Sequence, residues 1–110
     1  MSIRTNRKPD AMLDLQHLQT FQAVAQTSHF GRAAAALGCS QPTVTTRIKA
    51  LERRLGASLL ERARFSKTTI LTDRGRQLLG YADRILALAS ETTAAVQRAD
   101  SLTAGSHYPK

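Results

Sequence analysis

The sequence predicts a mainly α-helical fold: three short helices, a small β-hairpin and one long final helix. Apolar residues recur at spacings of three and four over most of residues 13–99, as on one face of an amphipathic helix. Gly38 and Gly56 interrupt this pattern at points where helices commonly end. Between Gly56 and residue 72 the pattern changes to short β-prone pieces, which are typical of a hairpin.

Size and composition exclude several classes of protein. The 110 residues allow one small domain, and 42% of them are apolar, which is enough for a core. The one cysteine, Cys39, cannot form an intrachain disulfide or a cysteine-rich zinc site. No apolar run reaches the roughly 18 residues of a membrane span, and residues 1–10 lack the apolar stretch of a secretory signal. We therefore expect a cytoplasmic protein that needs neither a membrane, a metal ion nor a cofactor.

Positive charge is concentrated in the middle of the chain. The net charge is +8, and residues 47–76 hold nine basic and three acidic residues, so +6 of it lies there. A basic region of this kind is expected of a protein that binds phosphate backbones, although a solvated surface that keeps the protein soluble has the same composition. Aromatic residues are 5% and tryptophan is absent, which argues against a platform for stacking single-stranded bases.

The first two helices are marked by caps and small residues. Asp14 can cap a helix whose inner positions are Leu15, Leu18, Phe21, Val24 and Ala25. A second helix is expected from about Gly31 to Leu37, ended by Gly38. Ala33 and Ala34 on its inner side let another helix approach closely, as a tight helix-turn-helix requires.

The third helix carries the most informative surface. Ser40 is a good N-cap, Pro42 suits the first turn, and the helix runs to about Leu55. Its predicted buried positions are Val44, Ile48, Leu51 and Leu55. The opposite face holds side chains able to donate hydrogen bonds to bases and phosphates, or to water as on an ordinary exposed helix: Gln41, Thr45, Thr46, Lys49 and Arg53.

A hairpin is predicted after the third helix. Residues 59–60 and 69–71 are β-prone and flank a basic link, and two strands alone are marginal, so the hairpin must lean on the helices. Its tip carries Arg62, Arg64 and Lys67, which suggests a wing lying against a groove or backbone. A surface hairpin made soluble by charge is the alternative.

Thr72 can cap a long last helix over residues 73–99. Its apolar stripe has the spacing of a coiled-coil seam, with Leu78, Ala82, Ile85, Ala89 and Val96 as the predicted dimerisation residues. Leu79 and Leu86 form a neighbouring line that could pack on the chain's own core. A helix this long cannot bury one whole side against so small a core, so a partner chain is expected. The alternative is a helix folded back on its own domain.

Residues 13–75 resemble the N-terminal DNA-binding domain of LysR-type transcriptional regulators. The resemblance rests on AAAALGCSQPTVTTRIKALERRLGASLLER over residues 33–62, together with Leu71, Thr72 and Gly75. It implies a winged helix-turn-helix at residues 13–72 that forms homodimers through a linker helix at 73–99. The third helix would enter the major groove of double-stranded DNA and the wing would touch the flanking minor groove or backbone. Family members bind interrupted inverted repeats near promoters.

Part of the expected site follows from the same resemblance, which implies contacts with bases and neighbouring backbone by Gln41, Pro42 and Thr45 and a wing contact by Arg62, with Arg64 and Lys67 nearby. Together with the polar face of the third helix, the residues expected to read bases are Gln41, Pro42, Thr45 and Thr46. Those expected to contact the backbone, directly or through the wing, are Arg32, Ser40, Lys49, Arg53, Arg62, Arg64 and Lys67.

The sequence departs from the family pattern in four ways. Thr45-Thr46 stands where Ser-Arg is usual, and Arg47 is not expected to replace the missing arginine because one helical residue turns a side chain by about 100°. Leu60 stands where Phe is usual, and the wing is about two residues longer than the family's common pattern. We expect the 110 residues to hold no effector domain of the kind that follows the linker helix in the family. We also expect residues 1–12 to be a mobile extension and 100–110 a disordered tail.

We do not expect the chain to be an enzyme. The sequence has no phosphate-binding loop, no zinc-protease motif and no nucleophile elbow, and its three histidines are scattered. Cys39 near His29 could form a nucleophile pair, but a small buried residue is the simpler interpretation. Two binding hypotheses remain: a sequence-specific regulator of duplex DNA, and a basic helical dimerisation module acting on a protein partner, for example by forming mixed dimers with full-length regulators. The polar face of the third helix discriminates between them.

Overall fold

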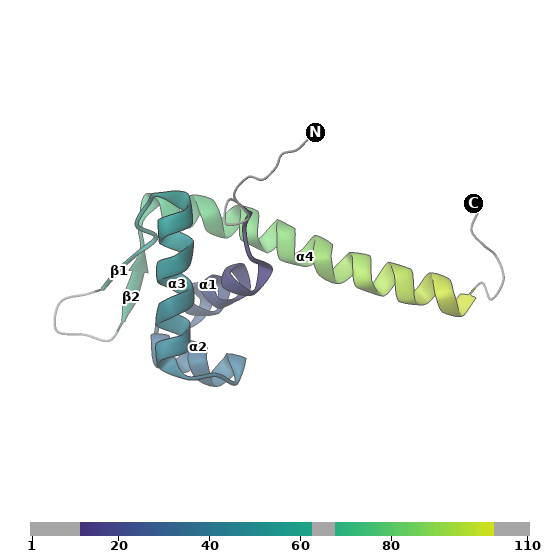
Figure 1. Ribbon diagram of the computed structural model, residues 1–110, viewed down its shortest axis with the longest axis horizontal. Coiled ribbons are helices and arrows are strands. Elements are labelled where there is room, and N and C mark those ends of the chain that lie inside the picture. Colours follow the sequence, from purple (N-terminus) through teal and green to yellow (C-terminus); the bar gives the residue numbers. More distant parts are fainter. Residues whose placement is uncertain (1–11, 63–67, 103–110) are drawn as a thin grey trace.

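The computed structural model describes residues 12–62 and 68–102 (Figure 1). Its elements in chain order are α1 (Leu15–Thr27), α2 (Phe30–Leu37), α3 (Gln41–Leu55), β1 (Leu60–Arg62), β2 (Thr69–Leu71) and α4 (Asp73–Leu102). The first three helices gather around one core, the hairpin packs through β2 against α1 and α4, and α4 extends far beyond them. The predicted mainly helical fold with a two-stranded hairpin is confirmed. Residues 1–11 of the predicted extension (1–12) and residues 103–110 of the predicted tail (100–110) lie outside the described residues.

Side-chain caps start the first three helices. The carboxylate of Asp14 accepts a hydrogen bond from the Gln16 N–H at 2.8 Å, and this bond lowers the pKa of Asp14 below its usual value. Ser40 accepts from the Thr43 N–H at 3.2 Å, as predicted for an N-cap. The second helix starts at Phe30, one residue before its predicted start, because the imidazole Nδ1 of His29 accepts from the Arg32 N–H at 3.1 Å and acts as the cap.

The turn between α1 and α2 contains a left-handed residue that is not glycine. Ser28 has φ of 57°, a conformation that L-residues other than glycine rarely adopt. Two backbone hydrogen bonds hold it. Its N–H donates to the Val24 carbonyl at 2.7 Å, and its carbonyl accepts from the Thr69 N–H at 3.0 Å. The hairpin therefore helps to fix the turn that leads into α2.

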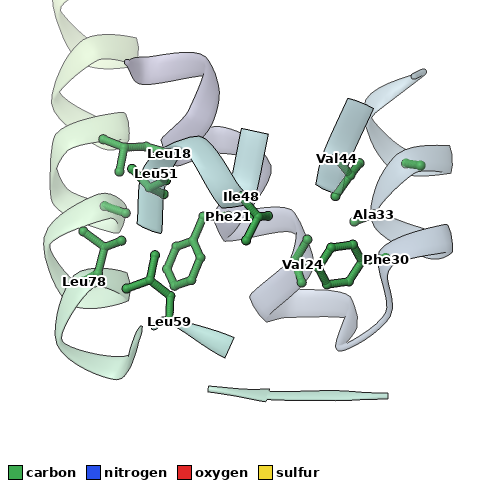
Figure 2. Close-up of a cluster of buried hydrophobic side chains, with 12 residues drawn as sticks. Leu18, Phe21, Val24, Phe30, Ala33, Val44, Ile48, Leu51, Leu59 and Leu78 are labelled. Carbon is green, nitrogen blue, oxygen red and sulfur yellow. The ribbon is translucent and has the colours of Figure 1, made fainter. Parts of the chain in front are cut away.

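One hydrophobic core joins the three helices, the loop after α3 and the start of α4 (Figure 2). Its buried members are Leu18, Phe21, Val24, Phe30, Ala33, Ala34, Val44, Ile48, Leu51, Leu59, Leu78 and Ala82. Two predicted core positions are wrong: Leu15 and Leu55 are exposed. Leu15 is the first residue of α1 and Leu55 the last of α3, where a helix has fewer neighbours to cover it. Cys39 and Leu60 are half-buried and pack against the core.

The hairpin leans on the helices, as predicted. Its strands are antiparallel, with Leu60 opposite Leu71 and Arg62 opposite Thr69. A bridge between His29 and Thr68 ties it to the turn between α1 and α2. These contacts supply the support that a lone two-stranded sheet lacks.

The first half of α4 belongs to the core of its own chain. Leu78 is 9% exposed and Ala82 is fully buried, so the prediction that both face a partner chain is wrong. Heptad spacing identifies an apolar face but not the chain that covers it. The helix also continues to Leu102, three residues past its predicted end. Within residues 12–62 and 68–102, no helix is long and apolar enough to cross a membrane.

Gly75 should be intolerant of a side chain. A Cβ there would lie 2.1 Å from the carbonyl oxygen of Leu59, whereas a Cβ at Gly80 would meet nothing within 4 Å. We expect Gly75→Ala to lower the free energy of unfolding by about 1–3 kcal/mol. Gly80→Ala should raise it by about 0.5–1 kcal/mol, because alanine loses less conformational freedom in a helix. Urea denaturation at one protein concentration measures both, and equal effects would contradict the close approach.

Candidate nucleic-acid interface

The exposed face of α3 is polar and basic. Its exposed residues include Gln41, Pro42, Thr46, Lys49 and Arg53, and Thr45 is half-buried beside them. The opposite side of the same helix is its buried stripe, with Val44 and Leu51 fully buried and Ile48 almost so. Because that stripe is held in the core, the polar side must face outward. The structure thus brings the predicted residues of α3 onto one surface.

The start of α3 lies against the start of α2. A Cβ built on Gly31 would lie 3.5 Å from the side-chain oxygen of Gln41 and 3.0 Å from the ring of His29. Arg32 is exposed in the same first turn of α2, and Ser40 is exposed at the cap of α3. The sequence did not predict the cap by His29, because histidine is not among the preferred N-cap residues. It also did not predict the close approach at Gly31, because a glycine at the start of a helix does not by itself indicate a close contact.

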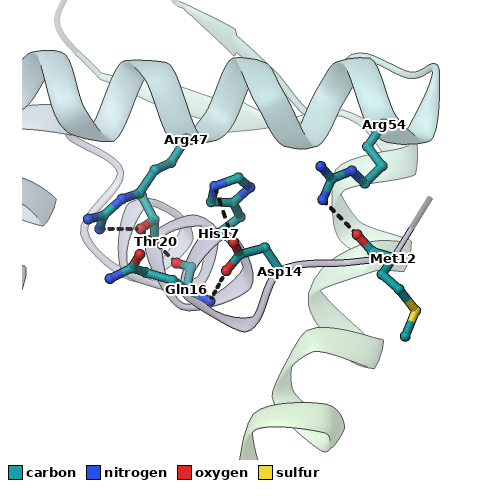
Figure 3. Close-up of polar contacts among 7 residues, drawn as sticks. All are labelled: Met12, Asp14, Gln16, His17, Thr20, Arg47 and Arg54. Atoms are coloured by element: carbon teal, nitrogen blue, oxygen red, sulfur yellow. Dashed lines mark hydrogen bonds and ion pairs between the residues drawn. The ribbon is translucent and has the colours of Figure 1, made fainter. Parts of the chain in front are cut away.

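Arg47 does not join the polar face. Its guanidinium Nη1 donates to the hydroxyl of Thr20 at 3.2 Å, and that hydroxyl donates to the Gln16 carbonyl at 2.9 Å (Figure 3). Thr20 is fully buried, so this contact joins α3 to the inside of α1. The expectation that Arg47 does not substitute for an arginine at position 46 agrees with this placement.

Two further arginines of the basic region also make internal contacts. Arg54 Nη1 donates to the Met12 carbonyl at 2.6 Å, which ties the end of α3 to the segment before α1 (Figure 3). Arg76 is paired with Asp73 and donates to the Leu71 carbonyl at 3.1 Å. The net charge of residues 47–76 therefore overstates the charge offered on any one face.

The hairpin places Arg62 next to α2. Arg62 is exposed at the end of β1, and its guanidinium carbon lies 4.8 Å from the centre of the Phe30 ring. This cation–π contact holds the cation beside the first turn of α2. Arg64 and Lys67, the other predicted wing residues, lie outside the described residues.

The described residues hold no candidate metal centre. None of their histidine, cysteine, aspartate and glutamate side chains form a group of three that could hold a metal ion. His29 caps α2 and His17 lies 3.8 Å from the Asp14 carboxylate, so both have contacts within the fold. Cys39 is half-buried at the turn before α3.

Comparison with known proteins places the chain in a family. The family model for the bacterial regulatory helix-turn-helix protein, lysR family, matches residues 15–76. The chain belongs to the LysR family. An uncharacterized HTH-type transcriptional regulator of Escherichia coli, YnfL, is 42% identical over 93 residues, which are 84% of this chain and 31% of YnfL. A probable hydrogen peroxide-inducible genes activator of Mycobacterium xenopi is 41% identical over 92 residues, or 84% of this chain and 48% of the relative. The chain thus spans a third to a half of these relatives.

Solved structures of LysR DNA-binding domains share the fold. The BenM DNA-binding domain in complex with catB site 1 DNA superposes with a TM-score of 0.77 at 32% identity, over 86% of this chain and 100% of that one. The CbnR DNA-binding domain in its DNA complex gives 0.73 at 36% identity, over 80% and 99%. The winged helix-turn-helix fold of this LysR-family chain is therefore confirmed.

Arg47 and Lys49 should differ in what they support. Arg47→Ala removes the hydrogen bond to Thr20, and we expect it to lower the free energy of unfolding by about 0.5–1.5 kcal/mol. Lys49 lies two residues after Arg47 and is exposed, so Lys49→Ala removes the same charge without removing a contact in the fold. It should change the free energy of unfolding by less than about 0.5 kcal/mol. Chemical denaturation of both variants checks this, and a loss for Arg47→Ala no larger than that for Lys49→Ala would show that the contact with Thr20 does not stabilise the fold.

Proposed function

We propose that the chain binds double-stranded DNA in a sequence-specific way, as the DNA-binding part of a LysR-type transcriptional regulator. The observation that carries the proposal is the exposed polar and basic face of α3, held outward by the buried stripe on the other side of the helix. An α-helix fits the major groove of B-DNA, so this face can reach base edges. The BenM and CbnR DNA-binding domains, which have the same fold, were solved in complex with DNA, and this supports DNA as the ligand.

The side chains of α3 suit both kinds of DNA contact. The amide of Gln41 can pair with the N6 and N7 positions of adenine, and the apolar surface of Pro42 and the methyl groups of Thr45 and Thr46 suit a thymine methyl. Four further residues can donate hydrogen bonds to DNA phosphates and so fix the position of the domain along the duplex: Arg32, Ser40, Lys49 and Arg53.

The wing completes the proposed interface on the flanking DNA. Of the three predicted wing cations, Arg62 lies within the described residues. Its position beside α2 would let it contact the minor groove or the DNA backbone next to the stretch of major groove that α3 occupies. We assign Arg64 and Lys67 the same role on the strength of the family resemblance. Lysine and arginine contacts of this kind release counterions, so they make affinity depend on salt.

Dimerisation on an inverted-repeat promoter site is the second part of the proposal. Because Leu78 and Ala82 are inside the core, we assign the partner-facing seam to the exposed apolar residues of α4. These are Tyr81, Leu88 and Val96, whose exposed fractions are 52%, 61% and 64%. Their spacings of seven and eight put them on one side of the helix, where a second α4 would cover them.

Ile85 and Ala89 lie between the core and this seam. Both are half-buried, and Ile85 packs against the core of its own chain, so they can contribute to the seam only at its edge. The same exposed stripe would also serve a mixed dimer with another regulator. DNA affinity without selectivity for sequence would favour that alternative.

Gln41→Ala tests base reading. With a duplex obtained by site selection on the wild-type chain, we expect the variant to lose about 1–3 kcal/mol of affinity for the selected site and little for random-sequence DNA. Gln26→Ala is the matched control, because it removes the same side chain from an exposed position on α1. Fluorescence anisotropy measures both affinities, and equal losses on both duplexes would exclude Gln41 as a base-reading residue.

Arg62→Ala tests the wing. The plot of log affinity against log salt should become shallower by about one unit, because one phosphate contact is lost. Arg84→Ala is the control: it removes an arginine that also lies over an aromatic ring, 5.0 Å from the centre of Tyr81, but on α4. The slope should stay at the wild-type value in the control. An unchanged slope for Arg62→Ala would remove it from the phosphate contacts.

Leu88→Asp tests the seam. A carboxylate among apolar partner residues is unfavourable, so we expect monomers by analytical ultracentrifugation at concentrations where the wild type is dimeric. Ala87→Asp introduces the same charge at the neighbouring exposed position, about 100° around the helix, and should remain dimeric. A dimer that survives Leu88→Asp would show that the seam lies elsewhere.

A further inference from the structure

A set of hydrogen bonds joins the end of α3 to the start of α4 through the loop between α3 and β1. The carboxylate of Glu52 on α3 accepts from the Leu59 N–H at 2.8 Å, and the Leu59 carbonyl accepts from the Thr72 N–H at 3.0 Å. The Thr72 hydroxyl donates to the Ser58 carbonyl at 2.7 Å and accepts from the Gly75 N–H at 2.9 Å. We call these five residues the joint.

The joint leaves almost no room for movement. The side chain of Leu59 is 1% exposed and inserted in the core, so its peptide cannot shift alone. On the other side, the first turn of α4 lies so close that a Cβ on Gly75 would come within 2.1 Å of the Leu59 carbonyl oxygen. The direction in which α4 leaves the domain is thus tied to the end of α3.

A second set of contacts fixes α4 at a different place. Leu78 and Ala82 bury α4 against the core, and the Gln22 amide on α1 donates to the Asp83 carboxylate at 2.8 Å. These contacts hold α4 on the domain, whereas the joint links its first turn to α3. Loosening the joint should therefore change the tilt of α4 while the domain stays folded.

Small tilts have large effects at the far end of α4. The helix has 30 residues, which gives a length of about 45 Å. The contacts at Leu78, Ala82 and Asp83 act as the pivot. A tilt of about 10° about them would move the far end, which lies about 29 Å beyond Asp83, by roughly 5 Å, more than the rise of one base pair at about 3.4 Å. The tilt of α4 would then decide how far apart the two α3 helices of a dimer lie.

We propose that the joint sets the spacing between the two half-sites that the dimer recognises, with Thr72 as its central positioning residue. Thr72 touches no base in this account. It acts by fixing α4 against the loop that follows α3. The proposal rests on the proposed function, because it requires a dimer that reads two half-sites.

Thr72→Val tests the proposal, since valine keeps the shape of threonine but can neither donate to Ser58 nor accept from Gly75. Thr72→Ser retains the hydroxyl and is the matched control. The probes are inverted repeats of the half-site selected by the wild-type chain, with the spacer varied one base pair at a time, and a duplex with a single half-site. Circular dichroism melting first shows that each variant is folded at the assay temperature.

We expect the wild type and Thr72→Ser to prefer one spacer length. In Thr72→Val the ratio of affinities between that spacer and its neighbours should fall by about threefold to tenfold, or the optimum should move, as the loss of one or two hydrogen bonds would produce. Affinity for the single half-site should stay within about twofold.

Three results would overturn the inference. If Thr72→Val keeps the wild-type optimum and ratio, the joint does not set spacing, and the proposed function stands. If Thr72→Val loses affinity for the single half-site as much as for the repeat, the joint supports the α3 surface itself. If the wild type shows no spacer preference at all, the dimer of the proposed function is also wrong.

Discussion

The packing of α3 against α1 and α2 is the constraint on which the rest of the structure depends. Val44, Ile48 and Leu51 are held in a core that Phe21 of α1 helps to fill, and this fixes the rotation of α3 about its axis (Figure 2). A helix that was free to rotate would offer no defined surface. Since the buried stripe is fixed, the polar side of α3 is exposed in one register. The proposed DNA-binding surface therefore follows from core packing rather than from any contact among the polar residues.

Polar contacts determine which of the basic side chains near α3 stay available on the surface. The side chain of Arg47 donates to α1, and that of Arg54 donates to the segment before α1. Part of the positive charge of α3 therefore stabilises its packing against α1. The Arg62 guanidinium stays on the surface because the Phe30 ring lies beneath it. Net charge is therefore a coarse guide to a binding surface, since it does not distinguish a cation bonded inside the fold from one offered to a ligand.

Much of this could be predicted from the sequence, because caps, glycine stops and apolar spacing are local signals. Ser40 and Gly56 mark the ends of α3 in the sequence and in the structure. The failures concern information that no local pattern holds. Apolar spacing on α4 could not reveal that Leu78 and Ala82 are covered by their own chain. The contact of Arg47 with Thr20 and the cap by His29 depend on side-chain directions across elements, which spacing does not give.

The most direct test of a duplex-binding surface on α3 is the affinity of the wild-type chain for a mixed-sequence DNA duplex, measured by fluorescence anisotropy over a range of salt concentrations. We expect binding at low salt, with log affinity falling linearly as log salt rises and a slope of about −4 or steeper, as several phosphate contacts require. Absence of binding at low salt, or an affinity that does not change with salt, would contradict the account. The basic residues around α3 would then serve solubility, and the exposed stripe of α4 would point to a protein partner.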